Sequence, residues 1–73
     1  MPPAQRKALA AILVTERKKA GLRQEDLAKK LKRDQTWVAR LEGGKRRIDV
    51  SEFFEIAEAI GFDPIKALAK IQG

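Results

Sequence analysis

The short spacing between two helical patterns in the middle of the chain constrains the fold more than any other feature. Residues 24–31 and 35–42 each carry apolar side chains at helical spacing, and only three residues, 32–34, separate them. Asp34 is a good N-cap for the second pattern, and two glycines end it. Because a three-residue connection is poorly suited to a long antiparallel hairpin, we expect the two helices to cross steeply.

Three further helical patterns complete the chain, and no segment alternates as a β-strand would. The first spans residues 4–19 and ends at a glycine. A sequence typical of a capping box, residues 49–52, begins another, and Asp63 followed by Pro64 begins the last. We therefore expect an all-α fold, a compact bundle of about five short helices.

Size and composition exclude several classes of function. A chain of 73 residues forms one small domain, which we place at residues 1–73. It contains neither cysteine nor histidine, which excludes disulfides, thiol nucleophiles, imidazole bases and the usual zinc sites. The longest apolar run, residues 8–14, is too short to cross a membrane and does not resemble a secretion signal. We expect a cytoplasmic protein without catalytic residues, metal or cofactor, and without contact to a membrane.

Charge divides the chain into a basic and an acidic part. The net charge is +6, and residues 17–47 hold twelve lysines and arginines against four acids, whereas residues 48–73 hold two against five. Charges that only solvate helices would be intermixed, so this segregation favours a polyanionic partner. Two short helices that cross steeply after a three-residue connection have the geometry of a helix-turn-helix. In such a unit, the first helix lies across the phosphate backbone and the second enters the major groove. Double-stranded DNA is therefore the expected partner.

Between Leu13 and Asp63 the chain resembles the phage-repressor and Cro class of helix-turn-helix domains, the xenobiotic-response-element type. The residues in register with the pattern of that family are Arg17, Gly21, Leu22, Gln24, Leu27, Ala28, Leu31, Gln35, Thr36, Val38, Arg40, Leu41, Glu42 and Gly44. Residues 53–61 are similar to its fourth helix. The resemblance implies a lambda-repressor-like fold, with the helix-turn-helix unit at about residues 24–43, and a non-enzymatic, sequence-specific transcriptional regulator.

The resemblance also implies roles for individual residues. Gln35, Thr36 and Arg40 match positions that face base edges, and their side chains suit adenine, the thymine methyl group and guanine respectively. Arg40 can alternatively reach a phosphate. Gln24 matches a residue that binds a phosphate, and Arg17 and Glu42 match a partly buried ion pair with a structural role.

Further cations are expected to contact the DNA backbone in a salt-dependent way. These residues are Arg23, Arg33, Lys45, Arg46 and Arg47. Arg33 can instead lie on Trp37, which either packs in the core or contacts the DNA. Two departures from the family pattern affect stability. Lys32 stands where glycine is common, and Arg23 replaces the usual Ser or Thr cap of the first helix of the unit.

The acidic part has more apolar residues than one face of two short helices buries. We expect Phe54, Leu68 and Ile71 to form a homodimer contact within a dimerisation region at about residues 53–73. The main hypothesis is a repressor that binds an inverted-repeat operator as a homodimer. The alternatives are an antitoxin or other protein-interaction module with a protein partner, and a scaffold that does not read DNA.

Overall fold

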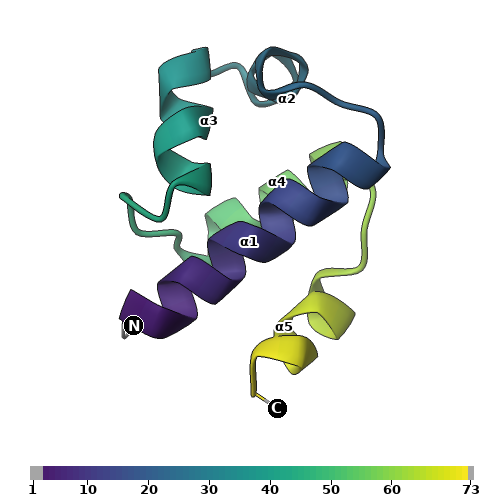
Figure 1. Cartoon of the computed structure of the whole chain (residues 1–73). Helices are drawn as coiled ribbons and strands as arrows, with labels where there is room; N and C mark the ends of the chain where they lie inside the picture. Colours follow the sequence, from purple (N-terminus) through teal and green to yellow (C-terminus); the bar gives the residue numbers. More distant parts are fainter. Residues whose placement is uncertain (1–2, 73) are drawn as a thin grey trace.

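The computed structural model describes residues 3–72, which form five helices (Figure 1). They are α1 (Pro3–Lys19), α2 (Gln24–Leu31), α3 (Gln35–Glu42), α4 (Val50–Ile60) and α5 (Pro64–Gln72). The described residues contain no β-strand, so the predicted all-α fold is confirmed. In Figure 1, α2 is seen end-on while α3 runs along the page, which shows that the two helices cross steeply, as expected.

Aspartates at the N-caps set the start of the last three helices. Asp34 Oδ1 accepts a hydrogen bond from the backbone N–H of Trp37 at 2.9 Å, and Asp49 Oδ1 accepts one from Glu52 at 2.7 Å. Asp63 Oδ1 accepts a similar bond at the start of α5, also at 2.9 Å. Each bond satisfies an N–H group that has no partner within the helix, which is why these short helices begin where they do.

The turn between α2 and α3 contains a left-handed residue. Lys32 has φ 57° and ψ 43°, and it is the only non-glycine residue with positive φ in the described part of the chain. For a residue with a Cβ this conformation costs roughly 1 kcal/mol. The N–H groups of Lys32 and Arg33 still close the end of α2 on the carbonyls of Lys29 and Ala28. A lysine therefore adopts the conformation that glycine usually takes.

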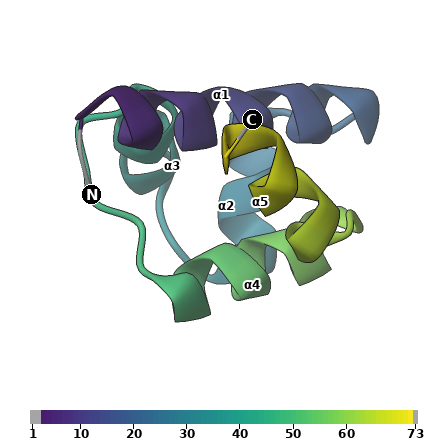
Figure 2. The same cartoon turned by 90° about the horizontal axis from the view of Figure 1, so that it is seen from below.

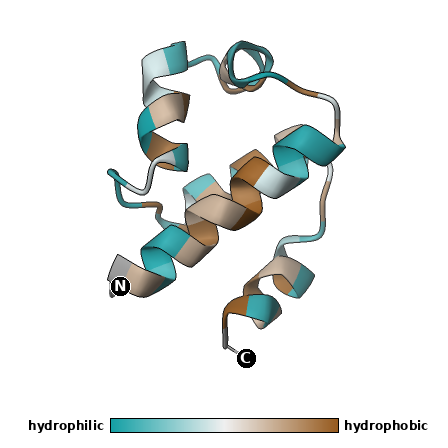
Figure 3. Ribbon diagram, viewed as in Figure 1, coloured by the Kyte–Doolittle hydropathy of each residue, from teal (hydrophilic) through white to brown (hydrophobic). Residues whose placement is uncertain are grey.

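Every helix contributes to a shared hydrophobic core. Leu13, Leu27, Val38 and Leu41 are fully excluded from solvent, and Ile56 is nearly so. Figure 2 shows α1 along one side of the molecule and α4 along the other, with α2, α3 and α5 between them. Figure 3 shows hydrophobic residues in the middle of α1 and hydrophilic residues towards its ends, so the middle of this helix forms one wall of the core. None of the helices in residues 3–72 is long and apolar enough to cross a membrane.

Candidate nucleic-acid interface

The side chains predicted to contact bases lie on the solvent side of α3. Gln35, Thr36 and Arg40 are all exposed, and Arg40 follows Thr36 by one helical turn, so the two share a face. Val38 and Leu41, on the opposite side of α3, are fully buried. The core therefore holds the helix in place while its polar face remains accessible.

A nearly buried ion pair connects α1 to the end of α3. Arg17 Nε donates to Glu42 Oε2 at 2.6 Å, and Arg17 Nη2 donates to Glu42 Oε1 at 3.0 Å. The two side chains are only 9% and 5% exposed. Arg17 Nη1 also donates to the carbonyl oxygen of Leu22 at 2.7 Å. The structure thus brings together the two residues that were expected to pair, and both charges are hydrogen-bonded where water is largely excluded.

The carboxylate of Glu42 also orients two glutamines. Gln24 Nε2 donates to Glu42 Oε1 at 3.0 Å, and Gln35 Nε2 donates to Gln24 Oε1 at 3.4 Å. Because a carboxylate only accepts hydrogen bonds, Gln24 turns its amide nitrogen towards Glu42 and its oxygen towards α3. Gln35 must then turn its own amide nitrogen towards Gln24. Within residues 3–72, this leaves the oxygen and one N–H of the Gln35 amide without a partner.

Two arginines stack on Trp37, the residue whose role the sequence left open. The guanidinium carbons of Arg33 and Arg46 lie 4.7 Å and 4.8 Å from the centre of the indole ring. Both distances are within the range of cation–π interactions. The ring itself is half-buried and packs against the core. Trp37 therefore joins the turn before α3, α3 itself and the loop after it.

Arg46 is held in place by the first turn of α4. Its Nη1 and Nη2 atoms donate to Glu52 Oε1 and Oε2 at 2.9 Å and 3.0 Å, and Nη1 also donates to the carbonyl oxygen of Arg47 at 2.7 Å. The hydrogen bonds between the two side chains are the main reason why the pKa of Glu52 lies below, and that of Arg46 above, its ordinary value.

Sequence reasoning identified Glu52 only as the last residue of a capping box, a role it also has, since its Oε1 accepts from the N–H of Asp49 at 3.2 Å. Its partner Arg46 lies in an irregular loop, and no periodicity relates a loop residue to a helix that follows it. The contact therefore has no signal in the sequence.

The other expected backbone-contacting cations are exposed. Arg23 is 72% exposed in its side chain and pairs with Glu25 at 2.8 Å and with Asp26 at 3.1 Å. Asp26 Oδ2 also accepts from the backbone N–H of Arg23 at 2.8 Å. The Arg23 side chain has no acceptor, so it cannot cap a backbone N–H of the first turn of α2 as Ser or Thr would. Hydrogen bonds from Arg23 lower the pKa of Asp26. Lys45 and Arg47 form no ion pair within residues 3–72, so their charges are available to phosphates.

The residues expected at a dimer contact are exposed to different degrees. Phe54 on α4 is 39% exposed, whereas Leu68 and Ile71 on α5 are half-buried and pack against the core. Two apolar residues that were not among the expected dimer contacts are more exposed, Val50 at 70% and Ile65 at 63%. Since Val50 and Phe54 are four residues apart on α4, they share a face of that helix.

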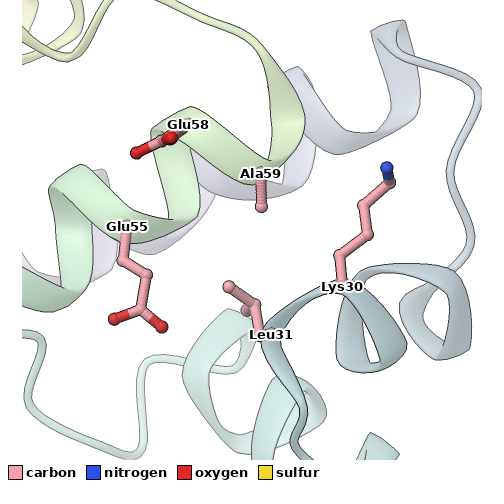
Figure 4. Close-up of a pocket in the computed structure, with 5 residues that line it drawn as sticks. All are labelled: Lys30, Leu31, Glu55, Glu58 and Ala59. Atoms are coloured by element: carbon pink, nitrogen blue, oxygen red, sulfur yellow. The ribbon is translucent and has the colours of Figure 1, made fainter.

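A shallow hollow of about 470 Å³ lies between α2 and α4 (Figure 4). It is lined by Lys30, Leu31, Glu55, Glu58 and Ala59. Two carboxylates against one ammonium group disfavour a phosphate at this place, so the hollow does not belong to the nucleic-acid interface.

Together, the steep crossing of α2 and α3, the polar outer face of α3 and the cations around it define a helix-turn-helix DNA-binding domain. A family model described as a helix-turn-helix domain matches residues 8–68. The chain is also similar to solved structures. One is an XRE-family like protein from Pseudomonas syringae pv. tomato str. DC3000, with 39% sequence identity over 94% of this chain and 84% of that chain and a TM-score of 0.87.

A second similar structure, the clp gene regulator ClgR from Corynebacterium glutamicum, shares the fold at 23% identity, over 94% of this chain and 90% of that chain, with a TM-score of 0.86. No curated protein matches the sequence. The chain belongs to the helix-turn-helix domain family, of the XRE-like type. The predicted resemblance is therefore confirmed, and the chain is a DNA-binding transcription regulator of a non-enzymatic family.

Proposed function

We propose that the chain reads a specific DNA sequence in the major groove with Gln35, Thr36 and Arg40. The observation that carries this proposal is the orientation of the Gln35 amide. Its nitrogen is drawn towards Gln24, which leaves one acceptor and one donor on the exposed face of α3. An adenine edge offers the complementary N6 donor and N7 acceptor, so Gln35 selects adenine. Arg40 suits guanine, and the methyl group of Thr36 suits the methyl of thymine.

We also propose contacts to the DNA backbone that hold α3 in this position. The residues that we assign to phosphates are Gln24, Arg23, Arg33, Lys45, Arg46 and Arg47. Gln24 is the first residue of α2, where free backbone N–H groups also favour an anion. These contacts fix the register of the domain on the duplex and carry no sequence information of their own.

We further assign the regulator as a repressor that binds an inverted repeat as a homodimer. In a two-fold dimer, the two α3 helices would reach half-sites about 34 to 36 Å apart, one turn of DNA. The exposed side chains of Val50, Phe54 and Ile65 support this assignment. The contact residues that we assign are Phe54 and the half-buried Leu68 and Ile71. A repressor of this kind needs only to occupy an operator.

The test is selection of bound sites from a random duplex pool by the purified protein at near-physiological salt. We expect enrichment of an inverted repeat with an adenine at one position of each half-site, and loss of that preference in Gln35→Ala. If no sequence is enriched while the protein captures a tight protein partner, the chain is instead an antitoxin-like interaction module.

A further inference from the structure

We propose that Glu52 and Trp37 are positioning residues, which hold Arg46 so that the free edge of its guanidinium group binds a DNA phosphate beside α3. This inference rests on the proposed function. It assigns a role in DNA binding to an acidic residue, which charge alone would place among the groups that oppose binding.

The hydrogen bonds of Arg46 leave one edge of its guanidinium group free. A guanidinium group has five N–H donors. Glu52 and the carbonyl oxygen of Arg47 take two donors of Nη1 and one of Nη2. The Nε–H and the second N–H of Nη2 have no partner in the described residues. These two donors lie side by side on one edge, in the fork geometry that matches two oxygens of a phosphate.

The contacts of Arg46 also fix the plane of the group. Glu52 holds it end-on through both carboxylate oxygens, and the ring of Trp37 lies under its face at 4.8 Å. The side chains of Arg46 and Glu52 are 29% and 18% exposed, so neither is free in solvent. An arginine that is already ordered loses less conformational entropy when it binds a phosphate than a free surface arginine does.

The position of Arg46 agrees with such a contact. It lines a shallow hollow of about 320 Å³ together with Asp34, Thr36, Trp37 and Arg40. Two of these residues, Thr36 and Arg40, are assigned to base edges. A DNA strand whose bases meet those side chains carries its phosphates past the same hollow. The one carboxylate among the described residues that line this hollow, that of Asp34, is already engaged as the cap of α3, where it accepts the N–H of Trp37.

Charge and positioning predict opposite effects for Glu52→Gln. The substitution removes a negative charge, so electrostatics alone predicts tighter DNA binding. Positioning predicts weaker binding, because a neutral amide no longer holds the guanidinium group through two charge-assisted bonds. Glutamine keeps the side-chain oxygen that accepts the N–H of Asp49. Glu58→Gln, on the exposed side of the same helix, makes the same charge change and is the matched control.

The experiment measures the dissociation constant for a duplex of mixed sequence at fixed salt, well below the melting temperature of each variant. We expect Glu52→Gln to bind about three to ten times more weakly than the unchanged protein, and Glu58→Gln to bind at least as tightly as the unchanged protein. In an Arg46→Gln background, Glu52→Gln should no longer weaken binding. The inference is overturned if Glu52→Gln binds as tightly as Glu58→Gln, or if its loss persists without Arg46.

Arg46→Lys and Trp37→Leu test the same contact without changing Glu52. Lysine keeps the positive charge but has no fork, and leucine keeps an apolar side chain but offers no ring to the guanidinium group. We expect both variants to bind more weakly than the unchanged protein, and equal binding by Arg46→Lys overturns the inference even if Glu52→Gln fails to fold. If the unchanged protein does not bind duplex DNA at all, the proposed function fails as well; if it binds and Glu52 has no effect, only the positioning role fails.

Discussion

At the scale of single residues, Glu42 both stabilises the fold and orients Gln24 and Gln35, two side chains that we assign to DNA contacts. Its carboxylate is 5% exposed and accepts hydrogen bonds from both Arg17 and Gln24. Glu42→Ala leaves the Arg17 guanidinium group buried without its counter-charge, which we expect to lower the free energy of unfolding by roughly 3 to 5 kcal/mol. Glu55→Ala, at an exposed position, should change it by less than about 0.5 kcal/mol. Urea denaturation measures both values, and equal stabilities would show that the pair is not a structural one.

Gln24 allows the two effects of Glu42 to be separated. Gln24→Met keeps the length of the side chain and leaves the Arg17–Glu42 pair intact, but removes the acceptor that orients Gln35. We expect the preference for adenine at one base pair to fall by about 1 to 3 kcal/mol while stability changes little. Loss of a phosphate contact would weaken binding to all duplexes by the same factor. The measurement is therefore the ratio of affinities for duplexes that differ at that base pair, and an unchanged ratio refutes the orienting role of Gln24.

At the scale of elements, the start of α4 depends on a pair of charges that responds to pH. The pKa of Glu52 lies below its ordinary value of 4.5, chiefly because of the hydrogen bonds from Arg46, with smaller contributions from the Asp49 N–H and the charge of Arg33. A pKa that is lower in the folded than in the unfolded state adds stability above the unfolded value. That stability is lost as the pH falls below 4.5 through the folded value.

We therefore expect the melting temperature of the unchanged protein to fall more steeply below pH 4.5 than that of Glu52→Gln. Asp26, whose pKa is also lowered, is present in both proteins and contributes equally to their acid loss. Thermal unfolding followed by circular dichroism from pH 7 to pH 3 makes the comparison. Parallel curves would mean that Glu52 does not titrate differently in the folded and unfolded states.

The helix bounds and the contacts between helices differ in how far the sequence could predict them. Helix starts depend on local contacts, such as Asp34 with the N–H three residues later, so the bounds of α2 to α4 could be predicted closely. The resemblance to a family supplied the Arg17–Glu42 pair, which no local pattern indicates. Sequence analysis left open whether Arg33 lies on Trp37, and the structure shows that it does. The contact of Trp37 with Arg46 forms through a loop of irregular backbone, where periodicity gives no information. This part of the site appears only when the loops are placed in space.

At the scale of the whole molecule, the two parts of the chain differ in charge and in exposed apolar surface. The cations lie mainly in residues 17–47, which include both helices of the helix-turn-helix, whereas the exposed apolar side chains lie on α4 and α5. A dimer formed through α4 and α5 would leave both basic surfaces free for one duplex. The arrangement thus allows one face of each protomer to bind its partner and another to bind DNA.

This division predicts that dimerisation can be removed without loss of DNA contact by the single domain. Val50→Glu places a charge on the face that Val50 shares with Phe54, and the 70% exposure of Val50 makes the change compatible with the fold. We expect the unchanged protein to sediment as a dimer at micromolar concentration and the variant as a monomer. The variant should still bind a half-site as the unchanged protein does, but lose the tighter binding to the inverted repeat that two linked domains provide. Val50→Thr, which keeps the shape of the side chain without a charge, is the control, and a monomer in the unchanged protein, both free and on an inverted repeat, would rule out the homodimer.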